Sequence, residues 1–224
     1  MHELITLVAA YLVGCINPAY FIGRIKGIDV KKVGSKNAGG SNALITMGAA
    51  IGVLCIVFDF GKAFGIIKLM MAVFPESPLI YCCAATGVIL GHSFPFYLRF
   101  NGGKGFACFG GCVLAFNPIV FLIMLGVEVF VLLGSGYLCI VSITSTFAFP
   151  IIYGIMTKNV AGALILAASM YTIPVKHIEN LKRIRTGDEL RISWLWNKEK
   201  EIERLNVDVE AEREKGQIKK EDSE

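Results

Sequence analysis

The sequence predicts an all-α integral membrane protein with about seven transmembrane helices, one of them a candidate half-helix. Hydrophobic residues occupy 54% of the 224 positions, and the mean hydropathy is +0.61. This is more apolar surface than a soluble domain of this length buries. The apolar residues also fall in runs close to the roughly 20 residues that a helix needs to cross a bilayer.

Seven apolar segments are candidates for membrane helices. The fourth is too short to cross a bilayer unaided, and Asn117-Pro118 directly after it predicts a tight turn. We therefore expect it to be a half-helix packed among its neighbours. The segments are residues 4–22, 45–74, 79–98, 106–116, 118–134, 137–156 and 160–175.

The distribution of lysine and arginine predicts the orientation. The connection at 23–44 has five such residues, the connection at 99–105 has two, and the chain from Lys176 onward has twelve. The alternate connections share only Lys158. Because cytosolic loops carry an excess of basic residues, we expect the N-terminus outside and the C-terminus in the cytosol.

Two parts of different composition are expected. Residues 1–192 form a polytopic membrane domain, and residues 193–224 form a charged cytosolic tail with few apolar residues. All seven cysteines fall inside the apolar runs, and the stretch most similar to a metal motif, Cys108-x3-Cys112, has no histidine or further cysteine at metal-ligand spacing. We therefore expect packing roles for the cysteines and no metal site.

Charged residues within the apolar runs are costly, since an unpaired charge in the middle of a bilayer costs about 3 kcal/mol on insertion scales. The runs contain Asp59, Lys62, Lys68 and Glu128. Asp59 and Lys62 are three residues apart, on one face of a helix. We expect them to form a structural ion pair, although charged residues inside a membrane commonly mark a functional site.

Two glycine-rich stretches precede predicted helices on the cytosolic side. Gly102 and Gly103 allow the backbone to approach a ligand closely, and Lys104 stands at a helix start, where free N–H groups and the helix dipole favour an anion. Gly39-Gly40-Ser41-Asn42 repeats the pattern, with two side chains of the N-capping type. We expect two sites for an anion such as phosphate, although glycines beside membrane helices can also serve only close packing.

Two histidines, His92 and His177, each lie near the cytosolic end of a predicted span. A single histidine at a helix end is usually a hydrogen-bonded interface residue, whereas two on one face of the membrane favour a functional site. Both are therefore candidate site residues.

Three stretches match the motifs of a known family in order and in spacing. The first is Gly34-Ser35-Lys36-Asn37-Ala38-Gly39-Gly40-Ser41-Asn42. The second runs from Gly91 to Gly105 and fits G-H-x-x-P-x-F/Y-L-x-F-x-G-G-K-G, and the third runs from His177 to Ile184 and fits H-x-x-N-I/L-x-R-L/I. On these residues the chain resembles the bacterial acyl-phosphate:glycerol-3-phosphate acyltransferases (the PlsY family) from the first span to about residue 190.

The resemblance implies a membrane enzyme that transfers a fatty acyl group from acyl phosphate to position 1 of glycerol 3-phosphate. The product, lysophosphatidic acid, enters phospholipid biosynthesis. The resemblance also implies a multi-pass protein of the bacterial inner or plasma membrane whose active site faces the cytosol. Because the acyl group arrives activated, no cofactor is expected, and the partners are the two substrates and membrane lipids, with no nucleic acid.

The resemblance assigns roles to residues by their motif positions. Lys104 and Ser35 would bind phosphate, and His177 with Asn180 would orient the glycerol hydroxyl. The general base is left open, because phosphate oxygens of the substrate could also accept the proton. The other expected substrate-binding residues are Lys36, Asn37, Gly39, Gly40, Ser41, Asn42, His92, Gly102, Gly103 and Ser142.

Three positions depart from the family pattern. Ile45 stands where the family usually has an arginine that meets phosphate, Lys36 stands where it usually has glycine, and Cys139 stands where it often has serine. Relative to the family pattern, the phosphate-binding cation has therefore either moved to Lys36 or been lost. This leaves two alternatives to the acyltransferase: a relative with altered or lost catalysis, and a transporter of a phosphorylated solute. The two halves of the chain show no internal similarity, which argues against the transporter.

Overall fold

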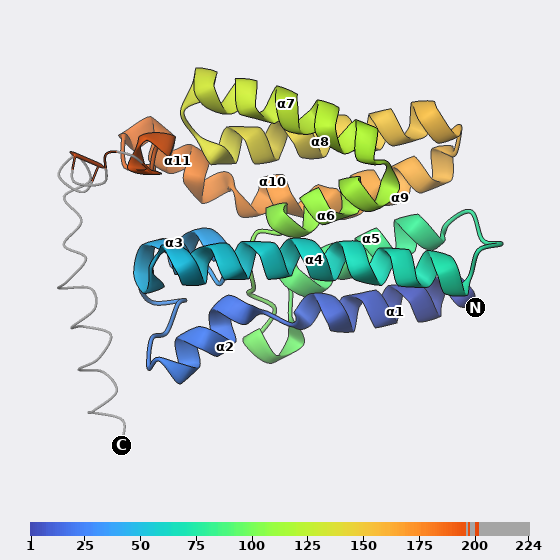
Figure 1. The fold of residues 1–224 in the computed structure, drawn as a ribbon, viewed down its shortest axis with the longest axis horizontal. Coiled ribbons are helices and arrows are strands. Elements are labelled where there is room, and N and C mark those ends of the chain that lie inside the picture. The colour runs from blue at the N-terminus through green and yellow to red at the C-terminus, as the bar shows by residue number, and fades with distance from the viewer. Residues whose placement is uncertain (196, 198–199, 202–224) are drawn as a thin grey trace.

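The computed structural model describes residues 1–195, 197 and 200–201, so most of the predicted tail at 193–224 lies outside the described residues. Within this part the chain is helical, without any β-strand (Figure 1). The α-helices are α1 His2–Cys15, α2 Pro18–Ile25, α3 Gly40–Met47, α4 Ala49–Val73, α5 Ile80–Ser93, α6 Phe106–Phe116, α7 Pro118–Ser135, α8 Leu138–Thr157, α9 Val160–Met170, α10 Thr172–Lys176 and α11 Ile178–Thr186. Two 3-10 turns, η1 Phe96–Leu98 and η2 Ile192–Leu195, complete the described elements.

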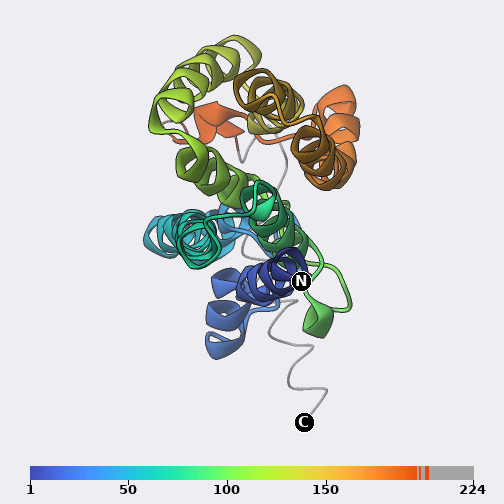
Figure 2. The ribbon, with the colours of Figure 1, turned by 90° about the vertical axis from the view of Figure 1, so that its right-hand side faces the viewer.

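The long helices run side by side in two groups. Figure 2 shows α7, α8 and α9 on one side, α1, α4 and α5 on the other, and α6 between them. The largest core cluster crosses this boundary, because buried side chains of α5, α6 and α9 pack together, among them Val88, Phe109 and Leu166. The short helix α6 is therefore the centre of the bundle.

Five helical stretches are long and apolar enough to cross a membrane, and α6 is a shorter apolar helix, as expected for a half-helix. The helix expected at 79–98 is shorter than predicted, because Pro95 disfavours helical backbone at the residue before it and α5 ends at Ser93. The helix expected at 45–74 begins later than predicted, because Gly48, with φ +95°, separates α3 from α4. The five stretches are His2–Ile25, Ala49–Val73, Pro118–Ser135, Leu138–Thr157 and Val160–Thr186.

The first stretch, His2–Ile25, is broken into α1 and α2. Pro18 has no N–H to donate to the carbonyl of Gly14, so the helix cannot continue through it. The side chain of Asn17 begins α2 by accepting a hydrogen bond from the Tyr20 N–H at 2.9 Å. At the break, backbone carbonyls have no N–H donor from their own helix. Side chains from other helices must donate hydrogen bonds to them.

The connections separate toward two ends of the bundle. Figure 1 shows the α2–α3 connection, the α7–α8 turn and α11 at one end, and the N-terminus, the α4–α5 connection and the α8–α9 turn at the other. The basic connection at 23–44 thus lies at the same end as the basic helix α11. This grouping matches the charge pattern from which the orientation was predicted.

Candidate active site

A hydrogen-bonded chain of polar side chains lies where the second and third motifs meet. The ammonium of Lys104 donates to Asn180 Oδ1 at 2.5 Å, and Asn180 Nδ2 donates to Glu189 Oε1 at 2.5 Å. Glu189 Oε2 in turn accepts from Arg183 Nε at 2.9 Å. Glu189 therefore fixes the amide of Asn180 so that its oxygen faces the lysine.

These groups come from three separate places in the chain. Lys104 precedes α6, between the tight glycine loop and Gly105, whose φ is +89°. Asn180 lies in the first turn of α11, and Glu189 follows the left-handed turn at Gly187 that ends this helix. The turn at Gly187 brings the carboxylate back against its own helix, beside Asn180.

The half-buried Lys104 has an altered affinity for protons. Burial lowers the pKa of Lys104 to about 8, and the nearby carboxylate of Glu189 opposes this shift. An ammonium has three N–H donors, of which one is donated to Asn180. The remaining two are suited to the oxygens of a phosphate.

His177 lies beside this chain and has a defined orientation. Its Nδ1 is 2.8 Å from the backbone carbonyl of Ile173, and a carbonyl can only accept. We therefore assign the proton of the neutral imidazole to Nδ1, so that Nε2 carries the lone pair. The ring is 5% exposed, and Lys104 is close enough to act on its charge. His177 can thus accept a proton through Nε2.

The first motif forms a folded loop organised by Asn42. The Asn42 amide is fully buried, accepts from the Ser35 N–H at 2.7 Å and donates to the carbonyls of Val30 and Val33 at 2.7 and 3.2 Å. These bonds hold the half-buried Ser35 in the loop. The geometry favours a loop-organising role for Asn42 rather than the substrate contact expected from the sequence.

The start of α3 also differs from expectation. Ser41 and Asn42 lie inside the helix, and the N-cap is Gly39, with no side-chain capping bond. A Cβ on Gly40 would overlap Ile56 of α4, so this glycine permits close helix packing. The Asn37 side chain lies beside Gly39, and Lys36 is exposed with φ +56°. This left-handed backbone is the physical reason for a glycine at the Lys36 position.

Gly102 and Gly103 pack against His92. Their N–H groups donate to the backbone carbonyls of Ser93 and His92 at 3.0 and 3.1 Å, and a Cβ on Gly103 would overlap His92 Nε2. Both N–H groups are thus already used, which favours a structural role over the expected backbone contact with phosphate. The same Cβ would lie 2.9 Å from the carbonyl of Ala38, so the two glycine-rich stretches are adjacent.

The face of α8 toward the site carries Cys139 and Ser142. Both are buried, and Cys139 is close enough to Lys104 to act on its charge. The Ser142 hydroxyl donates to the carbonyl of Leu138 in its own helix at 3.0 Å. Ser142 lies about one helical turn after Cys139 in α8.

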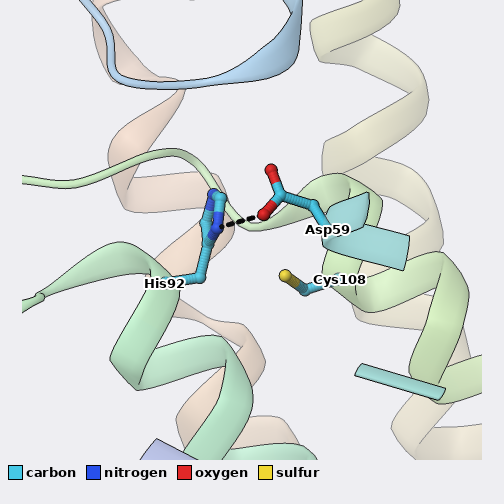
Figure 3. Close-up of side chains that lie close together, drawn as sticks. All are labelled: Asp59, His92 and Cys108. Atoms are coloured by element: carbon cyan, nitrogen blue, oxygen red, sulfur yellow. Dashed lines mark ion pairs between the residues drawn. The ribbon is translucent and has the colours of Figure 1, made fainter. Parts of the chain in front are cut away.

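One group of side chains has the composition of a metal site. Ligand atoms of Asp59, His92 and Cys108 lie within 4.8 Å of one another and point into a common space from α4, α5 and α6 (Figure 3). The ammonium of Lys62 already lies 2.7 Å from Asp59 Oδ1 and 3.2 Å from His92 Nδ1. A metal ion bound to this carboxylate and this ring would have to displace the ammonium, so the group fits Lys62 better than a metal.

Sequence reasoning missed two members of the site. Glu189 lies beyond the third motif, in a polar stretch without periodicity, and Arg183 matches the motif but received no role. The available signal for Glu189 was an acidic residue in the basic segment in and after the third motif, a property that Glu179 and Asp188 share. The ion pair expected between Asp59 and Lys62 is confirmed at 2.7 Å.

Known proteins are similar to this chain in sequence and in fold. A family model described as glycerol-3-phosphate acyltransferase matches residues 4–187. The glycerol-3-phosphate acyltransferase of Geotalea daltonii is 33% identical over 84% of this chain and 96% of its own length, and that of Clostridioides difficile is 33% identical over 84% and 95%.

Two crystal structures extend the likeness to three dimensions. The glycerol 3-phosphate form of PlsY, an integral membrane glycerol 3-phosphate acyltransferase, aligns with a TM-score of 0.78 and 30% identity over 86% of this chain and 96% of that chain. Its lysophosphatidic acid form aligns with a TM-score of 0.74. This chain belongs to the glycerol-3-phosphate acyltransferase family.

Proposed function

We propose that this chain transfers a fatty acyl group from acyl phosphate to the position-1 hydroxyl of glycerol 3-phosphate. The observation that carries the proposal is the group formed by Lys104, Asn180 and His177, which offers a half-buried cation close to a buried proton acceptor. The alignment with a structure described as a glycerol 3-phosphate form supports the choice of acceptor.

In the proposed reaction, Lys104 binds substrate phosphate with the two N–H groups that Asn180 does not take. The hydroxyl oxygen of glycerol 3-phosphate attacks the acyl carbon, and its proton passes to His177 Nε2 or to a phosphate oxygen. The bond from the acyl carbon to the phosphate oxygen breaks, and the electron pair leaves with inorganic phosphate. The products are lysophosphatidic acid and phosphate, and the atoms balance without a cofactor.

The remaining expected residues take supporting roles in this proposal. Ser35 and Asn37 line the first motif loop, and the uncapped first turn of α3 offers N–H groups to an anion. Lys36 supplies an exposed cation at the edge of the same loop. Ser142 lies deeper, on the α8 face toward the acyl donor, where its hydroxyl can leave Leu138 and donate to substrate.

The proposed setting is the bacterial inner or plasma membrane. Seven membrane segments, counting the short α5 and α6, with the N-terminus outside and the C-terminus in the cytosol, place the basic connections and α11 on the cytosolic side. Water-soluble glycerol 3-phosphate then reaches Lys104 from the cytosol, and acyl phosphate reaches it from the bilayer.

The experiment is turnover by the purified protein in lipid nanodiscs. Palmitoyl phosphate and glycerol 3-phosphate are supplied, and lysophosphatidic acid and inorganic phosphate are measured together by mass spectrometry and a phosphate assay. We expect equal amounts of the two products and no product when palmitoyl-CoA replaces the acyl phosphate. Phosphate release without lysophosphatidic acid, or no turnover at all, would favour the altered or silent relative.

A further inference from the structure

The break in the first membrane stretch is closed by a lysine from another helix. Pro18 leaves the carbonyl of Gly14 without its helical partner, and the ammonium of Lys62 donates to this carbonyl at 3.0 Å. The same ammonium donates to the carbonyl of Ile16 at 2.6 Å. A cation suits this place, because the C-terminal end of a helix is the negative end of its dipole.

Lys62 is also the centre of a buried charge cluster. Its ammonium lies 2.7 Å from Asp59 Oδ1, and the two side chains are 4% and 2% exposed. His92 Nδ1 lies 3.2 Å from the ammonium and 3.3 Å from the same carboxylate oxygen (Figure 3). A buried ion pair is stable only when further hydrogen bonds satisfy it, and here the broken helix and the histidine provide them.

The cluster contacts the loop that carries the active-site lysine. His92 accepts the Gly103 N–H at its backbone carbonyl, and Gly103 packs against its ring. The next residue is Lys104. On the other side of the break, Asn17 Nδ2 donates at 2.7 Å to the carbonyl of Ala38, which directly precedes the glycines of the first motif. Both glycine-rich loops are thus held next to the break between α1 and α2 and the charge cluster of Asp59, Lys62 and His92.

We propose that Asp59 and Lys62 are positioning residues for acyl transfer, which hold His92 and, through Gly103, place the ammonium of Lys104 against Asn180. The proposal rests on the proposed function for its effect on turnover. It differs from the expectation that the pair only neutralises charge within the membrane. A pair that only neutralised charge could be satisfied by any nearby hydrogen-bonding groups, whereas here its partners are the broken helix and His92, which contacts the loop before Lys104.

The geometry also explains why the cation is a lysine on α4. The ammonium reaches two carbonyls, a carboxylate and a ring nitrogen at once, from a helix that packs against both α1 and α6. Its three N–H donors can serve the two carbonyls and the carboxylate, and this carboxylate oxygen also lies 3.3 Å from His92 Nδ1, in the helix ahead of the Lys104 loop. An arginine has a longer, planar head that cannot take this arrangement without moving the break.

The test compares four variants in nanodiscs: Asp59→Asn, Lys62→Met, the double variant, and Lys68→Met as the matched control on an exposed face of the same helix. The double variant has no uncompensated buried charge and should fold even if the single variants are unstable. We expect it to fold with a somewhat lower thermal transition, because two backbone carbonyls lose their donor, and to lose at least about tenfold in kcat/KM, mainly through a higher KM for glycerol 3-phosphate. Lys68→Met should match wild type in both measurements.

A second measurement reads the position of Lys104 without turnover. The rate at which a small amine-reactive reagent modifies Lys104 is followed by peptide mass spectrometry as a function of pH. We expect the double variant to react faster and with a higher apparent pKa than wild type, because the lysine leaves its buried site.

The outcomes separate the two proposals. Wild-type kinetics and wild-type reactivity of Lys104 in a folded double variant would overturn the positioning role. A loss of activity no larger than the fraction of unfolded protein would overturn it as well. If wild type makes no lysophosphatidic acid, the proposed function fails, yet the Lys104 reactivity still decides the positioning.

Discussion

Replacement of Lys104 by methionine is the sharpest test of the active site. The change keeps most of the apolar stem but removes the ammonium that donates to Asn180 and, in our proposal, to substrate phosphate. The Asn180 amide then keeps its bond to Glu189, so we expect the local fold to persist. The variant therefore loses a half-buried charged donor to the doubly charged phosphate.

The magnitude follows from the value of such donors. A hydrogen bond to a charged group contributes about 1.5–3 kcal/mol, and a donor to developing charge in a dry active site about 2.7–4 kcal/mol. Because each 1.36 kcal/mol is a factor of ten, Lys104→Met should lower kcat/KM at least about a hundredfold.

The same residue predicts the pH dependence. Since the pKa of Lys104 is lowered to about 8, kcat/KM for glycerol 3-phosphate should fall above this pH as the free enzyme loses the ammonium. The alkaline limb of the kcat profile, where kcat falls with rising pH, should lie at a higher pH, because a bound phosphate favours the charged form of Lys104. Unfolding does not cause this loss. Between about 8 and the ordinary lysine value of 10.5 the unfolded chain binds more protons at this residue, so its contribution to stability rises with pH.

The assay is lysophosphatidic acid formation from pH 6 to 10, with wild type, Lys104→Met, Lys104→Arg and the exposed Lys158→Met as control. Lys104→Arg stays charged at every pH tested, so its residual activity should lack the limb near pH 8. A limb that persists in Lys104→Arg belongs to another group. Turnover of Lys104→Met within about fivefold of wild type would refute the role of the ammonium in phosphate binding.

Three further predictions test the surroundings. In a cysteine-free background, Glu76→Cys should react with an impermeant thiol reagent from outside and Asp188→Cys should not; the reverse pattern would overturn the cytosolic site. Glu189→Gln should move the alkaline limb of kcat/KM below pH 8, because the carboxylate favours the charged lysine, and an unmoved limb would contradict this electrostatic role. Lys36→Gly should preserve stability, since it relieves a left-handed backbone, yet raise the KM for glycerol 3-phosphate, and adding Ile45→Arg should restore it; no effect of Lys36→Gly would mean that its charge does not replace the missing arginine.

The helices could largely be predicted because their cause is local. Apolar runs of membrane length give membrane helices, and the short run at 106–116 is the short helix α6. The errors in predicted helix boundaries lie where a helix is interrupted within an apolar run. Residues 4–22 read as one run, but Pro18 and Asn17 divide it, because a proline removes one backbone donor however apolar its neighbours are.

The site could be predicted only where a motif carried it. Lys104, His177 and Asn180 come together as their motifs implied, since each stands at a helix end on one side of the bundle. Glu189 depends instead on a chain reversal at Gly187, which no spacing rule predicts. Its carboxylate nevertheless decides which way the Asn180 amide faces.

The pair Asp59 and Lys62 shows why a correct local prediction can still miss function. Their spacing on one helix predicts an ion pair, and the pair exists. The sequence contains no sign that the ammonium also meets carbonyls 46 and 48 residues earlier in the chain, at a break made by a proline. A buried lysine satisfied only by its own helix could be replaced together with its partner at little cost. A lysine that joins a broken helix to the loop carrying Lys104 could not be replaced without a loss of activity. The double variant of Asp59 and Lys62 measures this difference.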